Sequence, residues 1–261
     1  MKFEASYPSP EHEAAADGVV EFFSSRPVVQ AVLLTASCAH GGATIDSCLD
    51  IIVLIEAEAS PSEREKLKSG WESHHDSEEV YRRLRKVGAY SHIDMIFTDG
   101  LFMPKPREWT GGPDEFELDI GNTLAYSVPL WNRGERLQQL KEEWLPYYGE
   151  ELRKERLILV EKFFSNNLDH IPLYVERGLH FHAFNRFYDA YREFLQAAFI
   201  SWRIYPLSYE KWIRKQVYEL LCEPDLYSRL VDLFEISDFD GGDILGKGTG
   251  LRTLWKKFLK K

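Results

Sequence analysis

The stretch that decides the fold is "LLTASCAHGGATIDSCLDIIVLI", residues 33–55. In it an apolar run is followed by a turn of small residues and then by a second apolar run. Residues 28–36 and 48–57 are short, nearly all-apolar segments, which is typical of strands covered on both faces. The turn between them contains Ser37 and Gly41. Backbone N–H groups and a hydroxyl in such a turn are able to hold phosphate oxygens. The stretch therefore predicts two strands joined by an anion-binding turn.

Acidic side chains accompany these predicted strands. Side chains alternate along a strand, so Cys48 and Asp50 share a face of the second strand, and residues 91–99 form a third apolar segment that carries Asp94. Carboxylates on neighbouring strands are ligands for Mg²⁺ and a nucleoside triphosphate. We expect the three strands to lie side by side in one sheet, with the carboxyl groups of Asp50 and Asp94 close together.

The pattern of apolar residues divides the chain into two halves. Residues 1–130 alternate helical and strand segments, and they predict an α/β sheet domain. Residues 131–261 predict an α-helical bundle, so the fold class is α+β. The predicted helices are 9–25, 62–86 (interrupted near Gly70 and the His74-His75 pair), 133–148, 150–168, 180–204, 208–222 and 224–236. Turns are predicted at Pro146, Pro172 to Gly178, Pro206 and Pro224, and an edge strand within 122–132.

Composition excludes some classes of partner. The chain has 261 residues and a net charge of −10, with −11 in residues 1–130 and +1 in residues 131–261. A protein without a basic stripe is a poor nucleic-acid binder, because neutralising phosphates supplies most of that affinity. No apolar run reaches the roughly 18 residues of a membrane span. Three cysteines without a CxxC pair predict a reduced, cytoplasmic setting.

The motif order resembles the DNA polymerase β-like nucleotidyltransferase superfamily. That superfamily has Gly-Ser, a short turn, Asp-x-Asp on the next strand, and a third acid one strand later. Here Ala36 and Ser37 stand in the Gly-Ser places and Gly41 in the place of a common turn glycine. Cys48 and Asp50 stand in the Asp-x-Asp places, and Asp94 stands in the place of the third acid.

The second half is similar to the helical domain of a bacterial branch related to antibiotic nucleotidyltransferases. The likeness rests on an aromatic helix followed by "IYPLSYEKW", residues 204–212. The resemblance implies a nucleotidyltransferase-type sheet domain followed by a helical bundle. It also implies transfer of a nucleoside monophosphate from ATP or another nucleoside triphosphate to a hydroxyl group of a small-molecule acceptor.

The resemblance also assigns roles to residues. Mg²⁺ would be held by Asp50 and Asp94, and the nucleotide would lie against Ser37 and Gly41, with Lys211 from the helical half facing its phosphates. The base that deprotonates the acceptor would be Asp94, Glu117 or Asp119. The nucleobase, the acceptor and the oligomeric state are not predicted.

Cys48 leaves two functions open. Mg²⁺ prefers oxygen ligands, and a thiol near its ordinary pKa of about 8.5 contributes no negative charge at neutral pH. The chain is then either a nucleotidyltransferase with a weakened metal site or a non-catalytic descendant that binds a nucleotide or a partner protein. Magnesium dependence separates the two, because turnover by the enzyme requires the ion.

Overall fold

The computed structural model describes residues 3–109 and 111–259, and these form two compact units. The sheet unit comprises the chain up to Phe102 together with Ile120–Pro146, and the helical unit comprises Met103–Asp119 together with the chain from Tyr147. The predicted boundary at residue 130 therefore differs from the observed division. Charged residues of the 103–119 segment pair with the helices, whereas residues 136–144 form a helix that packs on the sheet unit.

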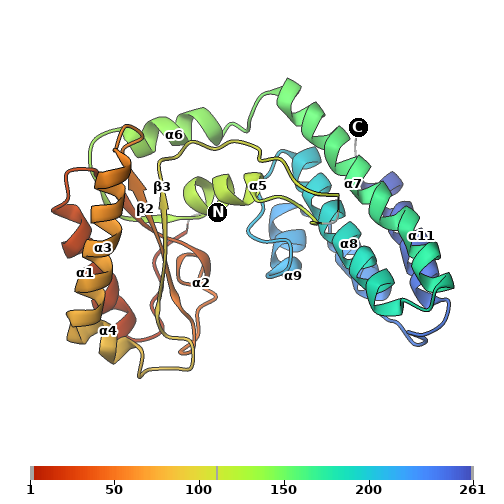
Figure 1. Cartoon of the computed structure of the whole chain (residues 1–261), viewed down its shortest axis with the longest axis horizontal. Helices are drawn as coiled ribbons and strands as arrows, with labels where there is room; N and C mark the ends of the chain where they lie inside the picture. The colour runs from red at the N-terminus through yellow and green to blue at the C-terminus, as the bar shows by residue number, and fades with distance from the viewer. Residues whose placement is uncertain (1–2, 110, 260–261) are drawn as a thin grey trace. The chain divides into compact units, whose positions relative to one another are not determined.

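The sheet unit is built on four strands in the order β3-β2-β1-β4. The neighbours β2 and β3 are labelled in Figure 1. Strand β2 runs parallel to β3, whereas β1 is antiparallel to both β2 and β4. The three predicted strands in one sheet and the predicted edge strand are thus confirmed. The strands are β1 (Val29–Leu34), β2 (Leu49–Ile55), β3 (Ile93–Thr98) and β4 (Val128–Asn132).

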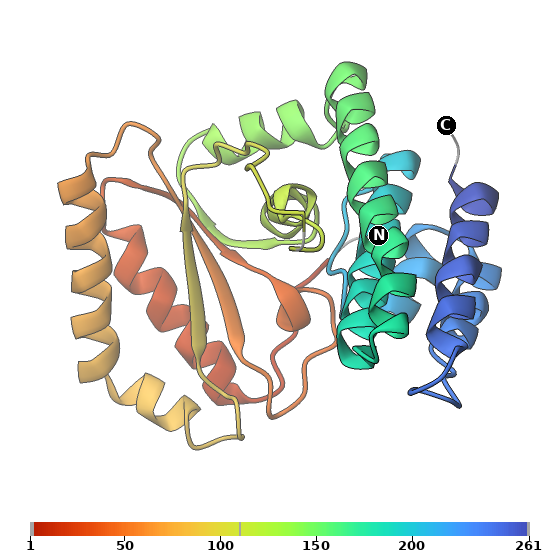
Figure 2. The ribbon, with the colours of Figure 1, turned by 45° about the vertical axis from the view of Figure 1, so that its right-hand side comes forward.

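One face of the sheet packs against α1 (Pro10–Ser24), which contacts β1, β2 and β4. The helix begins as predicted, with the Ser9 side chain accepting a hydrogen bond from the backbone N–H of His12 and a proline in the first turn. Its Val19 and Phe23 are fully buried in the core of this face. Figure 2 shows α1 lying across the strands.

The charged stretch after β2 forms two helices, α3 (Pro61–Ser77) and α4 (Glu79–Leu84). A capping box between Ser60 and Glu63 fixes the start of α3. The interruption predicted near Gly70 and the His74-His75 pair falls later, because the helix continues through both places and breaks at Glu78, whose backbone is extended.

Four short elements complete this part of the chain: α2 (Ala36–Ala39), α5 (Phe116–Ile120), the π-helix η1 (Gly121–Ala125) and α6 (Arg136–Trp144). Cys38 and Ala39 of α2 join the core under α1, whereas α5 lies at the division between the two units along the chain. Helix α6 contacts both β1 and η1. Covering is incomplete over β3, where Asp94 and Ile96 alternate with partly buried neighbours and are exposed. This face of β3 therefore opens to solvent.

The helical unit consists of α7 (Glu150–Glu176), α8 (His180–Trp202), α9 (Ile213–Lys215), the π-helix η2 (Gln216–Leu220), α10 (Pro224–Leu233) and α11 (Asp243–Phe258). Helices α7, α8 and α11 contact one another pairwise and lie side by side in Figure 2. The aromatic stripe of α8 is core, since Phe187 and Phe194 are fully buried. The predicted α+β class, a sheet domain followed by a helical bundle, is confirmed.

Two predictions in the helical half are wrong, and one helix was missed. Helix α7 does not end before Pro172 but runs through it to Glu176, held along its length against α8. Residues 208–222 do not form one helix, because 208–212 is a turn and only α9 and η2 follow. Helix α11 was not predicted at all, because its glycines disfavour helix in isolation.

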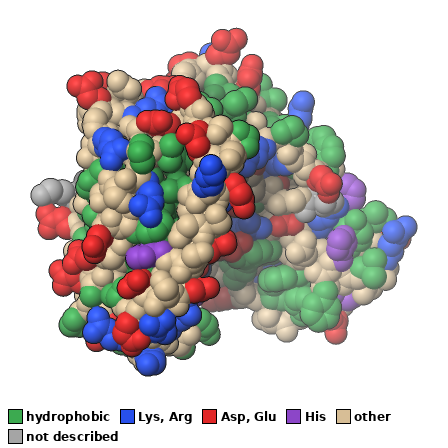
Figure 3. Space-filling model, turned by 60° about the vertical axis from the view of Figure 1, so that its left-hand side comes forward, with side chains coloured by type: hydrophobic (Ala, Val, Ile, Leu, Met, Phe, Trp, Pro, Cys, Tyr) green, Lys and Arg blue, Asp and Glu red, His purple; other side chains and the backbone are tan. Residues whose placement is uncertain are grey.

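No helix within residues 3–109 and 111–259 is long and apolar enough to cross a membrane. Acidic and basic side chains are intermixed over the face of the molecule drawn in Figure 3.

The three cysteines are free thiols, with Cys38 buried, Cys48 half-buried and Cys222 exposed.

Candidate functional site

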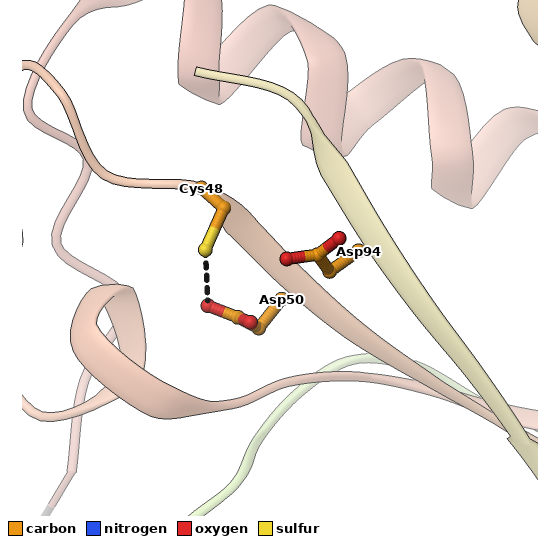
Figure 4. A group of neighbouring side chains, drawn as sticks. All are labelled: Cys48, Asp50 and Asp94. Atoms are coloured by element: carbon orange, nitrogen blue, oxygen red, sulfur yellow. Dashed lines mark hydrogen bonds between the residues drawn. The ribbon is translucent and has the colours of Figure 1, made fainter. Parts of the chain in front are cut away.

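Asp50 and Asp94 lie directly opposite each other on the parallel strands β2 and β3. Their neighbours Leu49 and Ile51 point into the core under α1, so the two aspartates project from the opposite face. One carboxylate oxygen of each and Sγ of Cys48 all lie within 4.8 Å of one another. Figure 4 shows the three side chains together at β2 and β3. The predicted proximity of the two carboxyl groups is confirmed, and Cys48 completes the cluster.

Cys48 carries its proton in this environment. Its Sγ donates a hydrogen bond to Oδ2 of Asp50 over 3.3 Å (Figure 4). Burial, followed by the negative charge of Asp50, raises the pKa of the Cys48 thiol to about 12. The cluster therefore holds two carboxylates and one neutral thiol at neutral pH, so it lacks the third negative charge of the nucleotidyltransferase motif.

Asp46 does not replace the missing carboxylate. Its Oδ1 accepts a hydrogen bond from the backbone N–H of Ala89 at 2.8 Å. A side chain at Gly88 would collide with the same carboxylate and with the carbonyl of Ile45, so the two loops touch there. Asp46 thus fixes the turn before β2 against the loop before β3.

His92 orients the Asp94 carboxylate. Its Nε2 lies 3.0 Å from Oδ1 of Asp94, and both side chains are about half exposed. The two residues are separated by one position on the same strand, so their side chains share a face. No signal in the sequence distinguished this histidine from an ordinary surface residue.

The turn after β1 contains two residues with a left-handed backbone conformation. Ala36 has φ of +51° and Gly41 has φ of +74°, both in the left-handed region. Ser37 lies in the short helix α2, and its carbonyl accepts a hydrogen bond from the N–H of Gly42. Space is open around Gly41, where an added Cβ would meet no described atom within 4 Å.

Two buried residues position the start of β2. His12 is fully buried, its Nε2 donates to the carbonyl of Ser47, and its Nδ1 lies 2.8 Å from the hydroxyl oxygen of Ser9. Nε2 carries a proton in this arrangement, because a carbonyl only accepts. The Cys38 thiol donates to the carbonyl of Cys48. Sequence reasoning missed both residues, since their partners are distant along the chain.

Two of the predicted site residues, Lys211 and Glu117, belong to the helical unit. Lys211 is exposed in the turn before α9, its N–H bonded to the Ser208 hydroxyl, and its role toward phosphate stays a prediction. Glu117 is fully buried and is held by Arg156, Tyr148 and Gln196, so it cannot act as a base.

Asp119 is a better candidate base than Glu117. It lines a pocket of about 200 Å³ that also contains Lys105. Burial, followed by the charge of Glu115, raises the pKa of Asp119 to about 6. The residue is nevertheless exposed overall, so solvent screens part of this effect.

The donor set fits Mg²⁺ only in part. In nucleotide sites Mg²⁺ is held by one or two carboxylates together with phosphate oxygens, and Asp50 and Asp94 supply two. The neutral thiol of Cys48 is a poor ligand for this hard cation. The residues present therefore fit one Mg²⁺ carried with a triphosphate, and they do not fit a pair of ions that needs a third carboxylate.

No family model matches this chain, and no curated protein does. Among solved structures, the chain is similar to a nucleotidyltransferase-like protein from Exiguobacterium sibiricum 255-15. The identity is 13% and the TM-score 0.46, with 94% of this chain and 74% of that chain covered. A likeness at this level assigns no activity to this chain.

Proposed function

We propose that the sheet unit is a nucleotidyltransferase-type site that binds a nucleoside triphosphate through a divalent ion on Asp50 and Asp94. The observation that carries the proposal is the direct register of these residues on parallel strands, with their carboxylates converging on an exposed face. The product class is a nucleoside monophosphate joined to a hydroxyl group of a small-molecule acceptor.

A second observation supports the phosphate-binding part. Ala36 stands where the superfamily has a glycine, and its φ of +51° is the conformation that glycine adopts without strain. The chain keeps this backbone shape although alanine disfavours it. Retaining the shape leaves Ser37 and the following N–H groups arranged for phosphate oxygens.

Each residue then has a distinct task. Ser37 and Gly41 bind the triphosphate, and Asp50 and Asp94 hold the ion. The bound ion neutralises phosphate charge during in-line displacement. Asp94 is the base candidate of the sheet unit, because its carboxylate is exposed and its orientation is fixed by His92.

The test measures ATP affinity with and without Mg²⁺ for the natural protein and for two variants, Asp50→Asn and Asp94→Asn. We expect Mg²⁺ to raise the affinity of the natural protein and to have little effect on either variant. Asp46→Asn is the matched control, because this exposed carboxylate lies two residues before Cys48 but bonds Ala89. ATP affinity that is independent of Mg²⁺ in the natural protein would overturn the proposal.

The neutral thiol of Cys48 favours a second candidate, a non-catalytic nucleotide-binding protein. Pyrophosphate release measured with a panel of hydroxyl acceptors separates the two candidates. Release that depends on Asp50 and Mg²⁺ supports the transferase, whereas Mg²⁺-dependent binding without release supports the binding protein.

A further inference from the structure

We propose that Cys48, Asp50 and Asp94 form a site that selects a thiophilic divalent ion of the zinc type over Mg²⁺. This deepens the proposed function, because it names the ion of the same site. The proposal concerns the ion alone, so nucleotide is not needed to test it.

The geometry supplies three converging donors of two kinds. Sγ of Cys48 and one oxygen of each aspartate lie within 4.8 Å of one another, a spacing that a single ion between them can bridge with small rotamer changes. Strand pairing fixes the backbone positions from which the three side chains project. Asp50 and Asp94 are in register on paired strands, and Cys48 directly precedes β2. Three protein ligands with one open position is the arrangement of zinc sites that keep a coordination place for water or substrate.

The donor chemistry decides between ions. Thiolate is a soft ligand that favours Zn²⁺, whereas Mg²⁺ takes oxygen ligands and dehydrates reluctantly. A thiol that coordinates zinc is deprotonated, so binding replaces the Sγ–H bond of Cys48 by an Sγ–metal bond and releases one proton. The Cys48 thiol already points at Asp50, so its sulfur lies next to the carboxylates (Figure 4).

The neighbours of the cluster support the same assignment. His92 bonds Oδ1 of Asp94, and hydrogen-bonded neighbours of this kind fix the orientation of ligating groups. Ligand exchange with solvent is possible, because Asp94 is about half exposed and β3 is uncovered on this face. The other two cysteines do not belong to the cluster: Cys38 bonds the backbone of residue 48 and Cys222 lies in the helical unit.

The experiment titrates the metal-free, full-length protein with Co²⁺ in excess Mg²⁺ and without nucleotide, and then displaces Co²⁺ with Zn²⁺. We expect one ion per chain, a near-ultraviolet band from cobalt–thiolate charge transfer, and release of one proton on binding. Cys48→Ser should abolish the band and lower Zn²⁺ affinity at least 100-fold, more than the roughly 10–100-fold typical for losing a neighbour of a ligand. Asp50→Asn should weaken binding while keeping the band at high Co²⁺.

Cys222→Ser and Asp46→Asn are the controls, since neither residue touches the cluster, and both should retain the band and the affinity. The proposal is overturned if the natural protein shows no thiolate band, if Cys222→Ser removes it, or if excess Mg²⁺ displaces the ion. Because ATP is absent throughout, each of these failures is distinguishable from a failure to bind nucleotide.

Discussion

Ala36 holds a conformation that costs an L-residue free energy. Its φ of +51° places Cβ too near the following carbonyl, at about 1–2 kcal/mol. The strain persists because the preceding residue is fixed twice: Thr35 donates its N–H to the carbonyl of Asp50 and its hydroxyl to the carbonyl of Asn122. At the residue scale, the turn is thus held in shape by the sheet and not by its own preference.

We predict that Ala36→Gly stabilises the protein by roughly 0.5–1 kcal/mol. Relief of the left-handed strain exceeds the added entropy of a glycine in the unfolded chain. The measurement is the midpoint of urea unfolding. Ala39→Gly is the control, because Ala39 is fully buried and should lose stability instead. Equal losses in both variants would show that position 36 is not strained.

At the scale of a single element, α11 forms a helix although its glycine content disfavours one. Gly246, Gly248 and Gly250 lower its intrinsic helix propensity by about 1 kcal/mol each relative to alanine. Two of them permit close packing: a Cβ at Gly250 would lie 2.7 Å from Cδ2 of Leu233, and one at Gly248 would lie 3.3 Å from Cδ1 of Ile171. The helix forms because its apolar side buries Leu251 and Leu254 against the bundle.

The same glycines give a matched pair of predictions. Gly246→Ala should raise the free energy of unfolding by about 1 kcal/mol, since the position is exposed and an added Cβ meets nothing described within 4 Å. Gly250→Ala should gain nothing or lose stability, because Leu233 must move. Thermal unfolding of both variants checks this, and equal stabilisation would contradict the packing account.

At the scale of the whole molecule, the chain crosses from one unit to the other and back. The 103–119 segment is anchored in the helical unit by buried charges: Arg156 pairs with Asp114 and Glu117, and Arg107 faces the fully buried Glu193 at 3.6 Å. Nothing in the local sequence marks these partners, which lie far apart along the chain. The buried charge pairs join the 103–119 segment to the helices, so the observed division into units differs from the boundary predicted at residue 130.

Glu193 should make stability fall with rising pH. Burial raises the pKa of Glu193 to about 7. The hydrogen bond from Asn167 and the positive charge of Arg107 lower the pKa, but they offset the effect of burial only in part. A folded pKa above the unfolded value of 4.5 contributes stability that is complete below pH 4.5 and lost as pH rises through 7. The loss is of the order of 3 kcal/mol.

Glu193→Gln removes this titration while keeping an oxygen for Asn167. The melting temperature of the variant, relative to the natural protein, should therefore rise between pH 5 and pH 8. Nearby Asp189 and Arg192 titrate or carry charge in both proteins, so the difference isolates position 193. A constant difference across this range would contradict the assignment.

The sequence predicts those parts of the molecule that have a local pattern of apolar residues or a motif. The strands around Asp50 and Asp94 follow from apolar runs, and their register follows from the motif order. His12 and His92 escaped notice, and the bond from Ala89 to Asp46 was not predicted, because each acts through a hydrogen bond that only the folded chain creates. Pro172 and the glycines of α11 were misjudged because packing against neighbouring helices outweighs local preference.

The melting temperature of Cys48→Asp with and without Mg²⁺ tests most directly whether this cluster is a metal site. A third carboxylate beside Asp50 and Asp94 restores a hard ligand, but it adds like charge when no ion is bound. We predict that the variant is less stable than the natural protein in chelator and gains more stability from Mg²⁺. An equal response of both proteins to Mg²⁺ would mean that the ion does not bind at Cys48, Asp50 and Asp94.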